Sequence, residues 1–183
     1  IRTLVDDFFS FGFVVVVAVF AVVVRGDGFT GRRRCNLVRC IRVNEAGEQA
    51  AYEANVTGLH NEVLRMMGRL KFRTSYGQNQ LAHAVEVSKL AGILAAELGA
   101  NIELSKQGGF LHDIGKAIDH EKEGGHPLVG KEFLITVKER PEVIEAAGGH
   151  HDQVLTHKYP YVSLAAAADA ISASRPGARR ESM

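Results

Sequence analysis

Residues Gly108–Lys116 read GGFLHDIGK, and the rest of the chain is organised around them. An apolar run ends there in His112 and Asp113, whose imidazole and carboxylate offer a divalent metal one nitrogen and one oxygen ligand. Because Gly115 has no side chain, we expect the backbone to leave its helix there in a conformation that other residues resist. Lys116 then follows about one helical turn after the pair, where its ammonium can meet a phosphate oxygen. A His-Asp pair alone is a weak signal, so the interpretation depends on its companions.

The composition sets the frame for any function. The 183 residues can bury one substantial core, and a net charge of +1 confines any nucleic-acid site to a local patch. Seven of the eight histidines lie between His83 and His157. Cys35 and Cys40 are too few for a disulfide scaffold and their spacing suits no common zinc site, so we expect unpaired thiols in a reducing compartment. Because the chain stops directly after a basic stretch, we expect it to be a fragment.

Residues 1–44 differ in composition from the rest of the chain and remain unassigned. Phe8–Val24 is an almost uncharged apolar run, and arginines follow it from Arg25 onward. Its length is at the lower edge of what spans a bilayer, and trailing arginines suit a cytoplasmic flank. Valine-rich runs also form buried or aggregation-prone strands, and the run shows no helical amphipathicity. A membrane span, a strand and a segment foreign to the domain all stay open.

Residues 45–75 are predicted to be a helical lead-in to the main domain. Ala46–Tyr52 favours a helix, Gly58 interrupts it, and Leu59–Leu70 shows helical apolar spacing again.

The connector that follows, KFRTSYGQN, is basic through Lys71 and Arg73. These two side chains are either a phosphate-facing edge or a solvated surface. Thr74 or Ser75 is expected to be the N-cap of the next helix.

Residues 76–183 are predicted to form an all-α domain, because no strand-like alternation occurs after residue 45. The expected helices are 78–98, 102–112, one opened by His126-Pro127, one running from Pro141 to Gly148-Gly149, and 162–174.

Histidines and aspartates recur at the ends and faces of these helices. Singly, each has an ordinary explanation: His83 shares an inward-facing stripe with Val87 and can be a core histidine, and Asp169 among alanines can cap a helix or pair with arginine. Together they favour one shared metal site. The candidate ligands are His83, His112, Asp113, His126, His150, His151 and Asp169.

The order His, His-Asp and distant Asp on successive helices resembles the HD phosphohydrolase superfamily, and the extra histidines resemble its two-metal members. The stretches GRLKFRTSYGQN, AGILAAELG, LHDIGKAIDHE and AADAISASRPGARRE look like the C-terminal catalytic domain of the ribonuclease Y family. This resemblance runs from about Glu45 to Met183. It implies an HD-domain helical bundle and a metal-dependent endoribonuclease that initiates mRNA decay.

The resemblance also implies roles for the candidate residues. One metal ion would be held by His83, His112, Asp113 and Asp169, and a second by Asp113 as a bridge with His126, His150 and His151. Asp113 and Lys116 would be catalytic. Imidazole-rich ligation suits manganese, iron or zinc, although magnesium stays open. The expected contacts to the RNA backbone are Lys71, Arg73, Arg175, Arg179 and Arg180, and no aromatic platform for stacking bases is expected.

The chain also departs from this family. Residues 1–44 contain neither the coiled coil nor the KH domain that the family carries before this point, and the family's C-terminal extension is missing. By analogy we expect a homodimer, RNA-decay partners and a cytoplasmic location, with attachment to the cytoplasmic face of the membrane left open. Two alternatives remain: an HD enzyme acting on nucleotides or cyclic dinucleotides, and a non-catalytic scaffold in an RNA-decay assembly.

Overall fold

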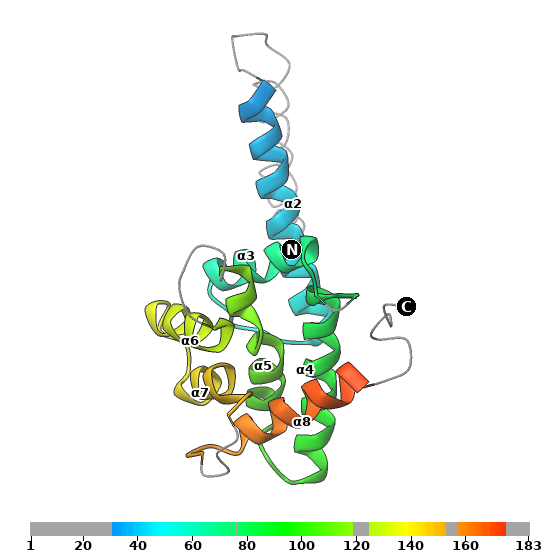
Figure 1. The fold of residues 1–183 in the computed structure, drawn as a ribbon, viewed down its shortest axis with the longest axis vertical. Helices are drawn as coiled ribbons and strands as arrows, with labels where there is room; N and C mark the ends of the chain where they lie inside the picture. Colours follow the sequence, from blue (N-terminus) through cyan, green and yellow to red (C-terminus); the bar gives the residue numbers. More distant parts are fainter. Residues whose placement is uncertain (1–30, 76, 119–124, 153–156, 175–183) are drawn as a thin grey trace, which may run out of the picture. The chain divides into compact units, whose positions relative to one another are not determined.

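The computed structural model describes residues 31–75, 77–118, 125–152 and 157–174, with side chains described from residue 40 onward. The described residues are almost entirely helical, so the all-α prediction is confirmed (Figure 1). The α-helices are α2 (Gly31–Ala54), α3 (Asn61–Arg69), α4 (Gln80–Glu97), α5 (Ile102–Leu111), α6 (His126–Thr136), α7 (Pro141–Gly149) and α8 (Tyr161–Ser174). Two short 3₁₀ turns, η1 (Leu70–Phe72) and η2 (Ile114–Ala117), connect them.

The chain divides into two units, Ile1–Arg39 and Cys40–Met183, and the second contains α2 from Cys40 onward and every later element. Within the described residues, no helix combines the length and the hydropathy that crossing a membrane requires. The apolar run Phe8–Val24 lies outside those residues, so its alternative interpretations stay predictions.

Helix α5 is the centre of the unit, and it packs against α4, α7 and α8 (Figure 1). Its last turn carries Phe110 and Leu111, both fully buried. The backbones of α5 and α4 approach closely at Gly109, since a Cβ on this glycine would lie 3.0 Å from the carbonyl oxygen of Val87 in α4. The apolar run ahead of the His-Asp pair is therefore the core of the fold, and the pair itself ends inside it.

The lead-in helices α2 and α3 cross through two glycines. A Cβ on Gly47 would lie 1.9 Å from the carbonyl oxygen of Leu64, and one on Gly68 would lie 1.8 Å from that of Val43. No side chain fits at either position, so the two helix backbones touch directly. Buried residues on α2 repeat at helical spacing on this side of the helix: Val43, Ala46, Ala50 and Ala54.

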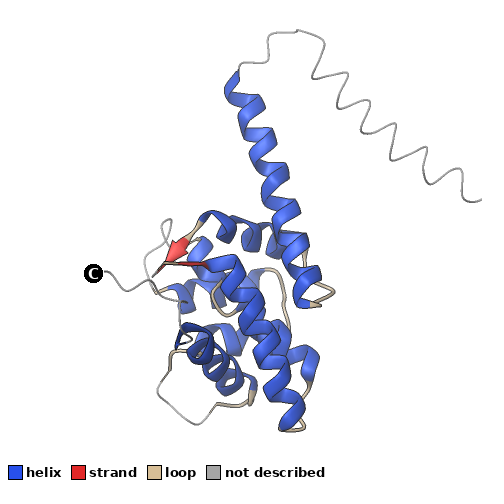
Figure 2. Ribbon diagram, turned by 90° about the vertical axis from the view of Figure 1, so that its right-hand side faces the viewer, coloured by secondary structure: helices blue, strands red, loops and turns tan. Residues whose placement is uncertain are grey.

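A two-stranded hairpin precedes α4, and the sequence did not predict it (Figure 2). Strands β1 (Thr74–Ser75) and β2 (Gln78–Asn79) pair antiparallel around Gly77, whose φ of +80° explains the glycine in the turn. The predicted N-caps at Thr74 and Ser75 are wrong. Asn79 caps α4 instead, accepting hydrogen bonds at its Oδ1 from the backbone N–H groups of Leu81 and Ala82.

Gly115 has a different role from the one predicted. Its φ is not in the left-handed region, unlike that of Gly99, which ends α4 as expected with a φ of +67°. A Cβ on Gly115 would instead lie 1.9 Å from the carbonyl oxygen of His126. The glycine is therefore required because the first turn of α6 rests on the η2 backbone, and this contact brings His126 toward the His-Asp pair.

Candidate metal centre

Four of the predicted ligands come from three helices and form a first group in the core. His83 lies on α4, His112 and Asp113 lie at the end of α5, and Asp169 lies on α8. The Nε2 of His83 is 3.0 Å from Asp169 Oδ1 and 3.8 Å from Asp113 Oδ2. The Nε2 of His112 is 3.2 Å from Asp113 Oδ2 and 3.9 Å from Asp169 Oδ1.

The remaining three histidines form a second group. His126 begins α6, whereas His150 and His151 follow the end of α7. One nitrogen from each ring lies within 4.8 Å of one nitrogen from each of the others. The ring of His150 is 4.1 Å from that of His151 and 5.0 Å from that of His112, measured between centroids, so the two groups adjoin.

Asp113 lies between the two groups and turns one oxygen toward each. Its Oδ2 faces His83 and His112, as given above, while its Oδ1 is 3.2 Å from His126 Nε2 and 3.8 Å from His150 Nε2. The carboxylate is almost fully buried. This arrangement is what a carboxylate that bridges two cations requires.

The buried polar atoms at the centre fit a metal ion. Among the described residues, four buried side-chain atoms have no hydrogen-bond partner: His112 Nε2, Asp113 Oδ1, His126 Nε2 and His150 Nε2. All four belong to this cluster. An orphaned buried polar atom is costly, and a cation shared by several such atoms removes the cost. The donor set of imidazoles and carboxylates therefore fits divalent metal binding.

Hydrogen bonds at the opposite ring nitrogens aim these imidazoles inward. The Nδ1 of His112 is 2.8 Å from the carbonyl oxygen of Gly109, and that of His150 is 2.9 Å from the carbonyl oxygen of Ala147. A carbonyl oxygen accepts only, so Nδ1 carries the proton and the Nε2 lone pair faces the cluster. The backbone three residues earlier thus orients each ring for metal ligation.

His83 is oriented by side chains that the sequence analysis missed. Its Nδ1 lies 3.0 Å from Ser172 Oγ, and the Ser172 hydroxyl donates to Glu86 Oε2 at 3.0 Å. With its own proton directed at Glu86, the hydroxyl oxygen accepts the Nδ1 proton of His83. Ser172 and Glu86 each lie three residues after a predicted ligand, Asp169 and His83, and this helical spacing is the signal that was available.

Lys116 contacts the centre directly. Its Nζ lies 2.5 Å from Asp113 Oδ2 and 3.1 Å from Gln80 Oε1. The Arg73 guanidinium hydrogen-bonds the carbonyl oxygen of Lys116, which ties the basic connector to the η2 turn. Lys116 is partly exposed while Asp113 is buried, so the ammonium lies at the mouth of the cluster.

In the metal-free protein His112 and Asp113 favour each other's charged form. Burial is the largest single influence and opposes the charged form of each, but their mutual attraction and hydrogen bond, together with the other neighbouring groups, outweigh it. The pKa of His112 is therefore raised, and the pKa of Asp113 lies well below its ordinary value. For Asp169, burial is the largest single influence and acts to raise the pKa, but the hydrogen bond with His83 and the attraction of His112 and His83 together lower the pKa below its ordinary value.

Two histidines of the second group, His150 and His151, have lowered pKa values. Burial, followed by the nearby positive charges of His112 and His151, lowers the pKa of His150 to about 3. Burial and then His126 also lower the pKa of His151. Neutral imidazole is the form that binds metal, so these two side chains need no deprotonation near neutral pH.

The predicted RNA contacts are not all placed by the structure. Lys71 is exposed on η1, and Arg73 points to the η2 turn as described above. The remaining three, Arg175, Arg179 and Arg180, lie outside the described residues.

Comparison with known proteins gives the same picture. The HD domain family matches residues 81–174, a span that contains all seven candidate ligands. The chain is 57% identical to Ribonuclease Y of Rhodopirellula baltica over 139 residues, and 54% identical to Ribonuclease Y of Desulforamulus reducens over 143 residues. It is 55% identical to Ribonuclease Y of Streptococcus agalactiae over 142 residues.

These alignments cover 76–78% of this chain, whereas the chain spans only 26–28% of the length of those relatives. No solved structure matches. The domain match over more than half of the chain, with seven ligand-type side chains meeting at its centre, shows that this protein belongs to the HD domain family.

Proposed function

We propose that this domain is a metal-dependent endoribonuclease, hydrolysing internal phosphodiester bonds of RNA in the first step of mRNA decay. The observation that carries the proposal is Asp113, whose two oxygens face separate groups of imidazoles. The similarity to Ribonuclease Y supports RNA as the substrate. Hydrolysis of nucleotides or cyclic dinucleotides has no comparable support.

The metal complement is part of the proposal. We infer two divalent ions, one held by His83, His112, Asp113 and Asp169, the other by Asp113, His126, His150 and His151. Imidazoles dominate the second group, which favours manganese, iron or zinc over magnesium. Bound there, divalent ions supply Lewis-acid charge stabilisation and a nucleophile at neutral pH.

The protein's own side chains define where the substrate approaches. His83, His112, Asp113 and His150 are buried, whereas Lys116, His126, His151 and Asp169 are partly or largely exposed. This exposed side is the mouth of the centre. At the mouth, the Lys116 ammonium is placed to leave Asp113 and face a nonbridging phosphate oxygen, where it stabilises the charge that develops during hydrolysis.

The wider assignments remain proposals. We propose that the catalytic domain occupies residues 76–183 behind a lead-in at 45–75. Lys71, Arg73, Arg175, Arg179 and Arg180 are proposed to contact the RNA backbone. A homodimer, partners in an RNA-decay complex and action at the cytoplasmic face of the membrane are proposed by analogy with the family.

The direct test is cleavage of a single-stranded oligoribonucleotide labelled at its 5′ end. The chain, stripped with EDTA and reloaded with Mn²⁺, Zn²⁺ or Mg²⁺, should release labelled products of intermediate length, which mark internal cuts. His112→Ala should remove the activity. A mononucleotide and a cyclic dinucleotide run in parallel should be poor substrates.

Two outcomes would contradict the proposal. If the reloaded chain hydrolyses the cyclic dinucleotide and leaves RNA intact, the domain is a nucleotide phosphohydrolase. If it binds metal tightly and cuts no phosphodiester, its role is that of a scaffold.

A further inference from the structure

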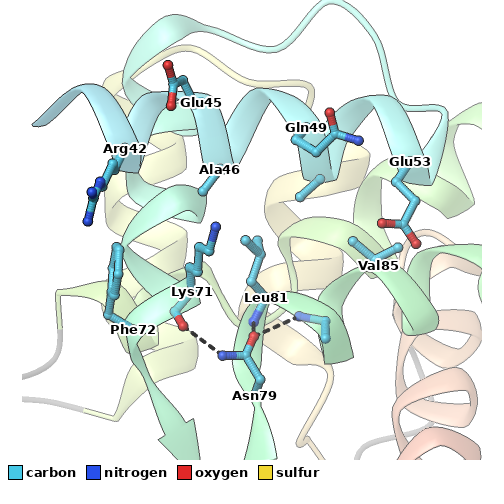
Figure 3. A pocket seen from close by; sticks show the side chains of 12 residues that line it. Arg42, Glu45, Ala46, Gln49, Glu53, Lys71, Phe72, Asn79, Leu81 and Val85 are labelled. Carbon is cyan, nitrogen blue, oxygen red and sulfur yellow. Dashed lines mark hydrogen bonds between the residues drawn. The ribbon is translucent and has the colours of Figure 1, made fainter. Parts of the chain in front are cut away.

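A pocket lies between α2, the η1 turn and the start of α4 (Figure 3). Its volume is about 720 Å³, within the range of pockets that hold small ligands. The floor is apolar and is made by Ala46, Ala50, Leu81 and Val85. None of these residues belongs to the candidate metal centre.

An aromatic side chain lines this pocket and is left open to solvent. Phe72 is 58% exposed, although the backbone that carries it is anchored. Leu70, two residues before it, is fully buried, and the Asn79 side-chain amide donates to the carbonyl oxygen of Lys71 at 2.7 Å. An exposed ring on a fixed backbone is a stacking surface that needs little further ordering to bind a planar group.

The charges around the ring are positive on balance. Arg42, Lys71 and the carboxylate of Glu45 lie at the same end of the pocket as Phe72, whereas Glu53 lies at the other end (Figure 3). Glu53 is also paired with Lys89, at 2.9 Å. The end of the pocket that holds Phe72 therefore carries two cations against one carboxylate beside an aromatic ring, and a net-positive aromatic surface is what single-stranded nucleic acids recognise.

The pocket shares its walls with the metal centre. On α4, Leu81, Ala82 and Val85 line the pocket, while His83 faces the metal ligands. The connector that carries Phe72 also contacts both sites. Phe72 lines the pocket, and the next residue, Arg73, hydrogen-bonds the carbonyl oxygen of Lys116. The two sites are thus separated by about the width of one helix, roughly 10 Å.

We propose that this pocket binds a nucleoside of single-stranded RNA, with the base stacked on Phe72 and the adjoining phosphate between Arg42 and Lys71. The inference rests on the proposed function and extends it, since it places part of the substrate strand outside the metal centre. It differs from the expectation that the domain has no aromatic platform for a base, because Phe72 is exposed at the pocket.

Binding without cleavage tests the pocket directly. The affinity of a fluorescein-labelled single-stranded oligoribonucleotide is measured by anisotropy in EDTA. Phe72→Ala should weaken binding by about 5–100-fold, the range found when a stacking aromatic is truncated. Arg42→Ala and Lys71→Ala should each weaken binding and reduce the slope of log K against log salt by about 0.7.

Matched controls exist on the same lead-in helices. Tyr52 is 82% exposed on α2 without lining the pocket, and Arg65 is exposed on α3, paired with Glu62. Tyr52→Ala and Arg65→Ala should leave RNA affinity unchanged. Because Phe72 is itself largely exposed, its truncation should not unfold the domain, which circular dichroism checks.

Cleavage separates this inference from the proposed function. In the metal-loaded chain, Phe72→Ala should raise KM for RNA and leave hydrolysis of bis(p-nitrophenyl) phosphate unchanged, since that diester is too small to reach the pocket. Equal RNA affinities of parent and Phe72→Ala overturn the inference. Phe72-dependent binding by a chain that cuts no RNA upholds the pocket and refutes the nuclease.

Discussion

The Nδ1 of His83 lies 3.0 Å from the hydroxyl oxygen of Ser172, 89 residues away in the sequence. The hydroxyl donates in turn to Glu86, so the serine is held as an acceptor toward His83. This pair of contacts fixes one tautomer of His83 and turns its Nε2 toward Asp169 and Asp113.

Ser172→Ala should therefore weaken metal binding without removing a ligand. Loss of a group that orients a ligating histidine typically costs about 10–100-fold in metal affinity. Isothermal titration of the EDTA-stripped variant with Mn²⁺ or Zn²⁺ measures the loss. Activity at saturating metal should recover to near that of the parent, because Ser172 acts through His83 and touches no substrate.

Ser174→Ala is the matched control. Ser174 lies on the same helix but is exposed, and its hydroxyl donates to the carbonyl oxygen of Ile171. Its replacement should leave metal affinity unchanged. Equal affinities for Ser172→Ala and the parent would show that His83 needs no support from α8.

Asp113→Ala should reduce metal binding at both groups, whereas Asp169→Asn should affect the first group alone. The reason is geometric: Asp113 faces both sets of imidazoles, and Asp169 lies near His83 and His112. Metal content after gel filtration gives the stoichiometry of each variant. RNA cleavage by Asp113→Ala should fall by about 10³-fold or more, with helical content near that of the parent.

Glu62→Gln is the control for a general loss of charge, because Glu62 is an exposed carboxylate paired with Arg65. If Asp113→Ala retains its metal and its cleavage, the assignment of the centre is wrong. If Asp113→Ala loses metal at only one of the two groups, Asp113 is a ligand of a single ion.

The sequence indicated candidate ligands more readily than the side chains that support them. His83 was proposed because helical periodicity places it on an inward-facing stripe, His112 with Asp113 because they end an apolar run, and Asp169 because it is a lone carboxylate among alanines. Ser172 was not found, because its helical spacing from Asp169 shows only that the two share a face, and its contact with His83 depends on how α8 packs against α4.

The role of Gly115 and the hairpin before α4 were also missed because neither leaves a local pattern in the sequence. Gly115 was assigned to a special backbone conformation, but the constraint is a contact with His126, and no local pattern reports a contact between distant segments. The two-residue strands at Thr74–Ser75 and Gln78–Asn79 are too short to show alternation.

Gly115→Ala should destabilise the domain and misplace His126. An added Cβ would lie 1.9 Å from the carbonyl oxygen of His126, so the first turn of α6 must shift. Overpacking of this kind costs about 1–3 kcal/mol, which urea unfolding in EDTA measures. The variant should also bind less metal at the group that contains His126.

Gly125→Ala provides the control, since among the described residues a Cβ there meets only Pro127, at 3.5 Å. Its free energy of unfolding should stay within about 0.5 kcal/mol of the parent value. A Gly115→Ala variant as stable as Gly125→Ala would mean that α6 can move away without cost.

The metal-free domain should lose stability as the pH falls below about 6.5, and His150 should account for part of that loss. The pKa of His150 is lowered to about 3, so between these values the unfolded chain binds a proton that the folded chain excludes. The free energy of unfolding then falls by up to about 1.4 kcal/mol per pH unit for this one group. His112 does not obscure the effect: its pKa is raised, so its contribution to stability is complete below its ordinary pKa and is lost only as the pH rises.

Urea unfolding of parent and His150→Gln in EDTA at pH 7, 6 and 5 measures the slopes. The variant should have the shallower slope, and parallel slopes would show that His150 is not held neutral in the fold.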